Sequence, residues 1–238
     1  MFFFNPYFNP IIVAAAVIPA VALMIYVYRQ DKLEREPLRL LLQLALMGAL
    51  AAFLASLTEK AGLWILGRFT YSSEDTYLAL VYFLVVAVSE EGFKYLLMKR
   101  KTWFSESFNC QYDGVVYAVF VALGFALVEN VGYVVQYGFS AALVRAVTAV
   151  PGHACFGVFM GAWYGSAKRY DNYGYPERST FFRVMSFLVP CLLHGIYDYV
   201  ASHEGGGYTA LFVGFIIVLF AVSFLLVRKL SREDRYID

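Results

Sequence analysis

Charged and titratable side chains interrupt several long apolar stretches of this sequence. They are Glu90, Glu91, Lys94, Glu129, His153, His194 and Asp198. Because each charge costs about 2.5 to 3.5 kcal/mol at the centre of a membrane helix, such a group indicates a functional site more than a packing device. A carboxylate beside a histidine in a wet cavity can take a proton from water for attack on a carbonyl, while nearby donors stabilise the oxyanion. These residue types therefore favour hydrolysis, with a peptide bond as the substrate.

The spacing of these residues predicts which of them share a helix face. Glu90 and Lys94 are four residues apart, as are His194 and Asp198. Residues at this spacing are neighbours on a helix and project together. Glu90 and the adjacent Glu91 point about 100° apart, so one of them is expected to face water. We favour Glu90 as that residue.

The charge balance of the group leaves three alternatives open. Four carboxylates against Lys94 give an excess of negative charge, so acids hold protons, the histidines are cationic, or a metal is bound. Lys94 is expected to support the site by keeping one glutamate ionised. A zinc site would use His153, His194 and Glu129, or Asp198 in place of Glu129. No His-Glu-x-x-His helix is present, and we favour a mechanism without metal, in which a glutamate activates water.

The composition predicts the elements that position these side chains. Of the 238 residues, 61% are hydrophobic and 16% are charged, which is typical of a polytopic membrane protein. A helix needs roughly 20 apolar residues to cross a bilayer. The expected fold is therefore an all-α bundle of about seven transmembrane helices that forms a single membrane domain over residues 1–238. The predicted spans are 11–28, 38–57, 76–98, 114–137, 141–166, 183–201 and 208–227.

Basic residues in the loops predict the orientation. Most of the 19 Lys and Arg residues fall in alternate connections, at 29–39, 99–101, 168–183 and 228–235. The opposite side has Lys60, Arg68 and Arg145. By the positive-inside rule the N-terminus is outside and the C-terminus is cytoplasmic.

Prolines and glycines predict local features of two of the expected spans. Pro151 and Pro190 precede the two intramembrane histidines and predict kinks that line a polar cavity. A stripe of small residues follows the first histidine and is expected to let another helix pack closely. The stripe consists of Gly157, Gly161 and Gly165.

Other features of the sequence are expected to be structural. Cys110, Cys155 and Cys191 offer no disulfide framework and are expected to pack as small apolar residues. The triplet Ala20-Val21-Ala22 follows the first apolar run, but no basic segment precedes that run, so we expect a retained span and not a cleaved signal. His203 lies in a glycine-rich outer loop and is left out of the site.

Four motifs in order, one on each of four successive spans, carry a family resemblance. They are Glu90-Glu91-Gly-Phe-Lys94, Phe125-Ala-Leu-Val-Glu129-Asn130, Pro151-Gly-His153 and His194-Gly-Ile-Tyr-Asp198. This set resembles the PrsW family of bacterial intramembrane proteases, in the wider group of CAAX prenyl endopeptidases and Abi proteins. In the CAAX-type relatives the second motif ends in histidine, whereas here it ends in Glu129, as is usual for PrsW.

The resemblance implies a function and roles for the residues. It implies a multi-pass protease of the bacterial cell membrane whose substrate is a membrane-anchored protein, with an anti-sigma factor cut on its extracytoplasmic side as the family example. Glu90 or Glu91 would activate water, and Glu129 or His153 would assist. The pair His194 and Asp198 would orient or stabilise the tetrahedral intermediate, with Asn130 in support.

Two functions of other classes use the same residues. A proton-coupled transporter relays protons through buried carboxylates and histidines, and a membrane adaptor without activity binds a partner helix. The sequence has no internal repeat of the kind that many transporters show, which disfavours the first. The net charge of +1 disfavours nucleic acid as a partner, so the expected partners are the lipid bilayer and a protein substrate.

Overall fold

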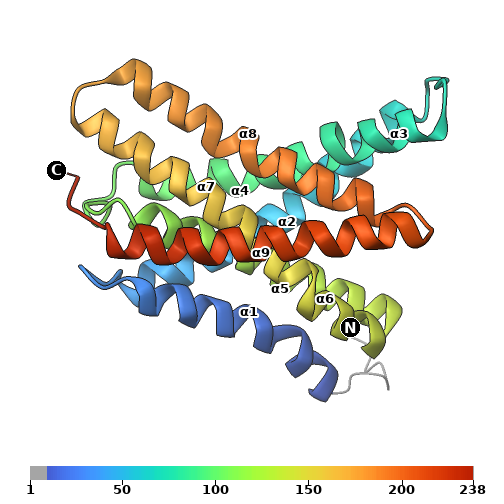
Figure 1. Ribbon diagram of the computed structural model, residues 1–238, viewed down its shortest axis with the longest axis horizontal. Coiled ribbons are helices and arrows are strands. Elements are labelled where there is room, and N and C mark those ends of the chain that lie inside the picture. Colours follow the sequence, from blue (N-terminus) through green and yellow to red (C-terminus); the bar gives the residue numbers. More distant parts are fainter. Residues whose placement is uncertain (1–9, 238) are drawn as a thin grey trace, which may run out of the picture.

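The structure, a computed structural model, describes residues 10–237 and is built from helices (Figure 1). In chain order these are α1 (Pro10–Gln30), α2 (Leu38–Leu66), α3 (Glu74–Leu80), the π-helical turn η1 (Val81–Val86), α4 (Ala87–Thr102), α5 (Asp113–Tyr137), α6 (Phe139–Val147), α7 (Ala149–Asn172), α8 (Pro176–Ala201) and α9 (Gly206–Arg232). Within the described residues no strand is present beyond one isolated bridge, between Cys110 and Tyr236.

The predicted membrane helices are present. Six helical segments of the described chain are long and apolar enough to cross a bilayer, and the segment Val17–Gln30 of α1 is a shorter apolar helix. Large apolar side chains such as Leu42 and Leu46 are more than 60% exposed on the outer faces, where a bilayer would cover them. The result is the predicted polytopic helical bundle.

Two spans differ in detail from the sequence prediction. The predicted span 76–98 is one continuous helix from Glu74 to Thr102, in which a π-helical turn at Val81–Val86 comes just before Glu90. The predicted span 141–166 is divided into α6 and α7 by Thr148, whose backbone (φ −121°, ψ −72°) is not helical. Pro151 therefore lies in the first turn of α7, where a proline is tolerated without a kink. Pro190 lies inside α8, as predicted.

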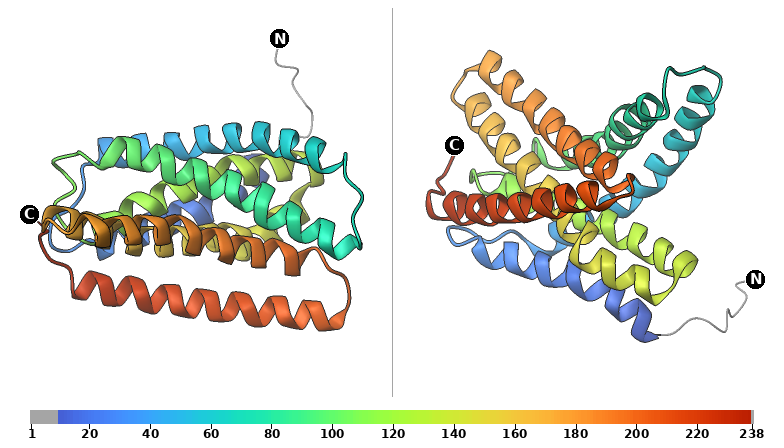
Figure 2. Two further views of the ribbon diagram at one scale, coloured as in Figure 1. Left: turned by 90° about the horizontal axis from the view of Figure 1, so that it is seen from above. Right: turned by 45° about the vertical axis from the view of Figure 1, so that its right-hand side comes forward.

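Helix α5 is the centre of the bundle. It is buried along most of its length and packs against α7 and α2 (Figure 2). The glycine stripe of α7 makes this packing possible, because a Cβ atom on Gly161 would overlap the backbone of Gly114 and Val115 in α5. The small-residue stripe is thus a packing surface, as predicted, and it brings the backbones of α5 and α7 close together.

The predicted cytoplasmic end is tied together by the C-terminal tail. The backbone N–H of Gln111 donates to Arg235 O (3.1 Å), and that of Ile237 donates to Asn109 O (2.8 Å). The Asn172 side chain donates to Ile237 O at 2.7 Å. The α4–α5 loop, the end of α7 and the tail therefore lie at one end of the bundle, opposite α3 and the α8–α9 loop (Figure 1).

Candidate active site

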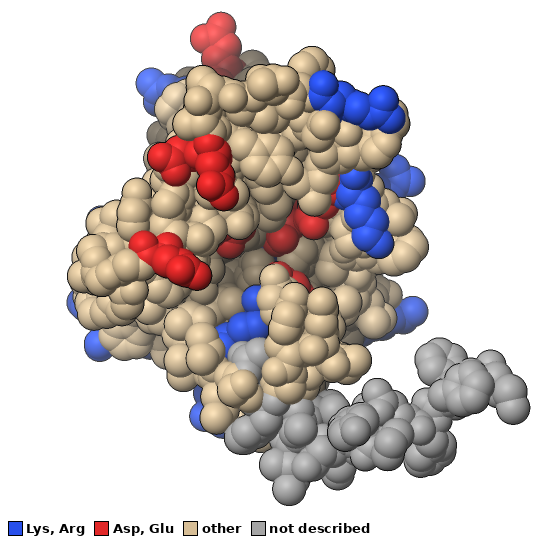
Figure 3. Space-filling model, turned by 90° about the vertical axis from the view of Figure 1, so that its right-hand side faces the viewer, with Lys and Arg blue, Asp and Glu red and all other residues tan. Residues whose placement is uncertain are grey.

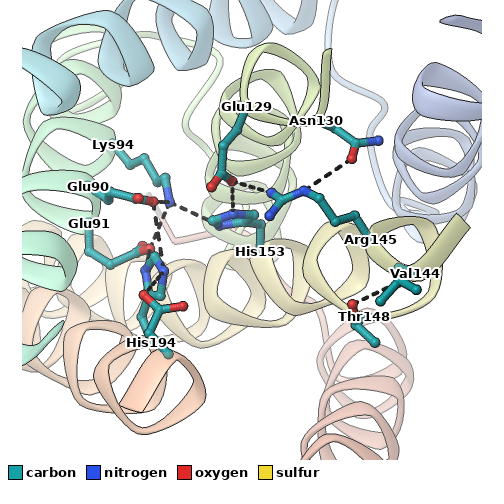
Figure 4. A network of polar contacts seen from close by, with 11 residues as sticks. Glu90, Glu91, Lys94, Glu129, Asn130, Val144, Arg145, Thr148, His153 and His194 are labelled. Atoms are coloured by element: carbon teal, nitrogen blue, oxygen red, sulfur yellow. Dashed lines mark hydrogen bonds and ion pairs between the residues drawn. The ribbon is translucent and has the colours of Figure 1, made fainter. Parts of the chain in front are cut away.

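Four helices bring the sequence-predicted residues together. Helix α4 carries Glu90, Glu91 and Lys94, while Glu129 is on α5, His153 on α7, and both His194 and Asp198 on α8. Figure 4 shows most of these side chains pointing toward one another. Groups that are far apart in the sequence thus form one network of polar contacts near the middle of the bundle.

Lys94 is the hub of this network. Its ammonium donates to Glu91 Oε1 at 2.8 Å and to Glu90 Oε2 at 3.2 Å. It also lies 3.2 Å from His153 Nδ1 and 3.8 Å from the centroid of the Phe125 ring. The side chain is almost fully buried, so these contacts replace the water that a charged group loses.

The two histidines have different hydrogen-bonding environments. An ammonium offers no acceptor, so Nδ1 of His153 must accept from Lys94, and its Nε2–H donates to Glu129 Oε2 at 2.7 Å. This arrangement fixes a neutral imidazole. His194 instead has carboxylates at both ring nitrogens, with Glu91 Oε1 2.8 Å from Nδ1 and Asp198 Oδ2 3.3 Å from Nε2. Because both ring nitrogens face an acceptor, both must carry a hydrogen, so His194 is in the imidazolium form.

Glu129 also has a cationic partner that sequence analysis missed. Arg145 Nη2 lies 2.8 Å from Glu129 Oε2, and Arg145 Nε donates to Asn130 Oδ1 at 3.2 Å. The guanidinium also stacks over the ring of Tyr133, 3.8 Å from its centroid. Arg145 had been assigned to the outer side of the membrane, although it stands within the predicted span 141–166. The same search for charges inside spans could have found it.

A cavity of about 570 Å³ opens beside the network. Glu90 lines it, whereas Glu91 and Lys94 are not among its lining residues. A second residue that sequence analysis missed, Glu59 of α2, also lines it; the span 38–57 had been predicted to end just before this residue. The other acidic, basic and histidine residues that line it are Glu129, Arg145, His153, His194 and Asp198. Figure 3 shows a hollow with acidic side chains inside it, on the end of the molecule where α3 lies.

Four residues of the network could hold a metal ion. Ligand atoms of Glu90, Glu91, His153 and His194 all lie within 4.8 Å of one another. Imidazoles and carboxylates are donors that zinc accepts. However, Lys94 Nζ contacts three of these four groups, so the ammonium occupies the place where a cation would bind. The set also differs from the predicted zinc ligands, because Glu129 lies on the far side of the His153 ring with Arg145.

Comparison with known proteins identifies the family. Residues 36–227 match the model of the family described as PrsW family intramembrane metalloprotease. The chain belongs to the PrsW family. Protease PrsW of Oceanobacillus iheyensis is 33% identical over 222 residues, which cover 93% of this chain and 97% of the relative. Protease PrsW of Geobacillus kaustophilus is 32% identical over 227 residues, with 94% and 93% coverage. Protease PrsW of Bacillus subtilis is 30% identical over 191 residues, with 80% and 83% coverage.

Family membership confirms the main functional prediction. The protein is an intramembrane protease, a hydrolase of the multi-pass PrsW type in the bacterial membrane, and the transporter and adaptor interpretations are not favoured. No solved structure matches this chain. The roles of the individual residues therefore have to be argued from the geometry of the site.

Proposed function

We propose that Glu90 is the general base that activates water for cleavage of a peptide bond in a membrane-anchored protein. The observation that carries this proposal is the difference between the two adjacent glutamates. Glu90 lines the cavity, whereas Glu91 is fully buried between Lys94 and His194. Water that enters the cavity meets the first carboxylate and not the second. Glu91 instead positions the two cations.

The proposed reaction is an ordinary hydrolysis. Glu90 takes a proton from water, and the water oxygen attacks the scissile carbonyl to give a tetrahedral oxyanion. His194 lies on the cavity wall, and its Nε2–H, whose contact with Asp198 Oδ2 is long at 3.3 Å, donates to that oxyanion in place of Asp198. Glu90 then passes its proton to the amide nitrogen as the C–N bond breaks, which leaves an amine and a carboxylic acid; the acid then transfers its proton to the amine, giving a carboxylate and an ammonium. Glu129 and Arg145 hold the His153 ring in place, and His153 and Glu91 hold Lys94 beside Glu90.

Zinc is the alternative source of activation for the same residues. A zinc ion held by Glu90, Glu91, His153 and His194 would polarise the carbonyl and lower the pKa of a bound water. Lys94 would have to leave its present position, because an ammonium and a divalent ion repel each other at this distance. The position of Lys94 favours the mechanism without metal.

The cavity opens toward one side of the membrane, and this direction of access indicates which class of substrate the site can reach. The cavity lies toward the end with α3 and the α8–α9 loop, which the positive-inside rule places outside the cytoplasm. We therefore propose that the substrate is a single-span membrane protein cut near its extracytoplasmic boundary. An anti-sigma factor is the example that the family resemblance suggests.

The test is cleavage of single-span fluorogenic reporters by the purified protein in liposomes. The reporters carry spans of membrane-anchored anti-sigma factors or of unrelated proteins, and mass spectrometry locates the cut. We expect a cut in the outer half of the span or just outside it, and a rate that falls by about 10²- to 10⁴-fold in Glu90→Gln. Glu204→Gln, in the exposed outer loop, is the matched control and should cleave normally.

A zinc chelator separates the two mechanisms. Unchanged cleavage in the chelator supports glutamate activation, whereas loss that added zinc restores would assign the activation to the metal. Normal cleavage by Glu90→Gln would contradict the assignment of the base. Cleavage on the cytoplasmic side would contradict the proposed direction of access.

A further inference from the structure

A second hollow of about 700 Å³ lies between α4 and α8, and none of its lining residues belongs to the active-site cavity. We call it the α4–α8 groove. Most of its lining is apolar and lies on helices that span the bilayer, so lipid tails are the medium around it. The lining residues are Thr58, Val88, Ser89, Gly92, Phe93, Tyr95, Leu96, Lys99, Thr180, Arg183, Val184, Phe187 and Leu188.

The cytoplasmic end of the groove is positively charged and has no acidic residue. Lys99 stands in the last turn of α4, and Arg183 lies two turns after the start of α8. Among the described residues neither side chain forms an ion pair. Arg183 donates to Thr180 Oγ1 at 2.9 Å, but its Nε is buried without a hydrogen-bond partner. The groove therefore has two positive charges and an unused donor at one end.

The length of the groove matches one leaflet of a bilayer. From Val88 to Lys99, α4 runs along the groove for eleven helical steps, or about 16 Å at 1.5 Å per residue. Half of a hydrocarbon core about 30 Å thick is about 15 Å. A lipid whose phosphate lies at Lys99 and Arg183 could thus extend an acyl chain along the groove as far as the middle of the membrane.

We propose that the α4–α8 groove binds an anionic phospholipid of the cytoplasmic leaflet. Basic pockets between transmembrane helices on the cytoplasmic side are typical sites for anionic headgroups. The span of a substrate protein fits the same groove less well. Its cytoplasmic flank would carry Lys or Arg by the positive-inside rule, and Lys99 and Arg183 would repel these charges. This inference is independent of the proposed catalytic roles.

The test is native mass spectrometry of the protein in a neutral detergent with added phosphatidylglycerol or phosphatidylcholine of the same acyl chains. We expect one phosphatidylglycerol to bind about 10-fold more tightly than phosphatidylcholine. The double variant Lys99→Gln, Arg183→Gln should lose this preference. The double variant Arg100→Gln, Lys101→Gln removes the same charge from the same end of α4 outside the groove, and it should keep the preference.

Two further variants test the apolar part of the groove. Val184→Trp fills it and keeps both cations, and because Val184 is 44% exposed the change should leave the fold intact. This variant should lose the bound lipid. A photoreactive benzoylphenylalanine at Leu188 should crosslink to lipid in native membranes. Equal loss of lipid in both charge variants, lipid binding unaffected by Val184→Trp, or a crosslink to a polypeptide would each overturn the proposal.

Discussion

Two clusters of carboxyl side chains inside this protein differ in what surrounds them. The mid-membrane cluster, Glu90, Glu91, Glu129 and Asp198, has a cation next to each of its acids: Lys94 contacts Glu90 and Glu91, His194 contacts Asp198, and Arg145 contacts Glu129. Glu59 lines the same cavity and is not counted in the cluster. The second cluster lies at the opposite end of the bundle from α3, the end that the positive-inside rule predicts to be cytoplasmic, and we call it the cytoplasmic cluster. None of its members forms an ion pair among the described residues. Its members are Asp31, Glu36, Asp113 and Asp234.

Backbone groups take the place of cations in the cytoplasmic cluster. Asp113 Oδ2 accepts from the N–H of Cys110 at 2.7 Å, and Asp234 Oδ1 accepts from the N–H of Tyr112 at 2.8 Å. Asp31 Oδ2 accepts from the N–H of Glu36 at 3.2 Å. Each of the four carboxyl groups also has one buried oxygen without a partner. These contacts close the α1–α2 loop on itself and tie the tail to the start of α5.

The surroundings of the two clusters also affect the charge that each one carries. Burial raises the pKa of Asp31 to about 6 and that of Glu36 to about 7, so these loop residues retain protons close to neutral pH. The mid-membrane acids instead lie within ion-pair distance of cations, and Glu90, Glu129 and Asp198 also line the cavity. An acidic cluster is therefore a candidate catalytic site here because of its cations and its cavity, and not because of its acids alone.

Removal of Lys94 should have the largest effect. Lys94→Met leaves Glu90 and Glu91 buried beside each other without their shared cation, which should cost about 3 to 5 kcal/mol of stability as well as activity. Thermal unfolding in detergent and reporter cleavage measure the two losses. Lys101→Met, at the cytoplasmic end of α4, is the control and should change neither. An unchanged unfolding temperature in Lys94→Met would show that the two glutamates do not need this cation.

Removal of Arg145 should have an intermediate effect. Arg145→Gln takes away one of the two partners that position Glu129, but the contact between Glu129 and His153 remains. We expect kcat to fall about 10- to 100-fold, as for a small misplacement of catalytic groups, with KM and unfolding temperature little changed. Arg68→Gln, which removes an exposed charge from the same end of the bundle, is the control. A change confined to KM would instead assign Arg145 to substrate binding.

The smallest effect should be the pH dependence of the folding stability that the cytoplasmic cluster contributes. Raised pKa values mean that the folded protein holds protons that the unfolded chain, with carboxyl pKa values of about 4, has released. The stability from these groups is complete below pH 4 and is lost as the pH rises through 6 and 7.

The measurement is the unfolding temperature at pH 5 and pH 8 for the wild type and Glu36→Gln. We expect the fall between these pH values to be about 2 to 4 °C smaller in the variant. Glu106→Gln, an exposed acid of the neighbouring α4–α5 loop, should behave like the wild type. An equal fall in all three proteins would remove the cytoplasmic cluster as the source of the effect.

Local spacing and composition predicted a large part of this structure. The predicted contacts Glu90–Lys94 and His194–Asp198 are both present at four-residue spacing, because a helix fixes which neighbours meet. The helical bundle follows from apolar runs that must satisfy their backbone groups internally. These features depend on short-range geometry, which a single sequence contains.

Several features that depend on the meeting of distant segments were not predicted. Arg145 reaches Glu129 only because the chain breaks at Thr148 and α6 lies beside α5. Asp234 joins the cytoplasmic cluster only because the tail folds back onto the α4–α5 loop. The π-helical turn before Glu90 also has no signal in the sequence pattern, since it adds a single residue to one turn.

The most direct test of the account compares one acid from each cluster in the same liposomes. The initial rate of reporter cleavage is measured for the wild type, Glu90→Gln and Glu36→Gln at pH 7. If the acids with fixed cations do the chemistry, Glu90→Gln lowers the rate at least about 10²-fold and Glu36→Gln leaves it within about twofold of the wild type. Equal losses in both variants, or normal cleavage by Glu90→Gln, would contradict the account.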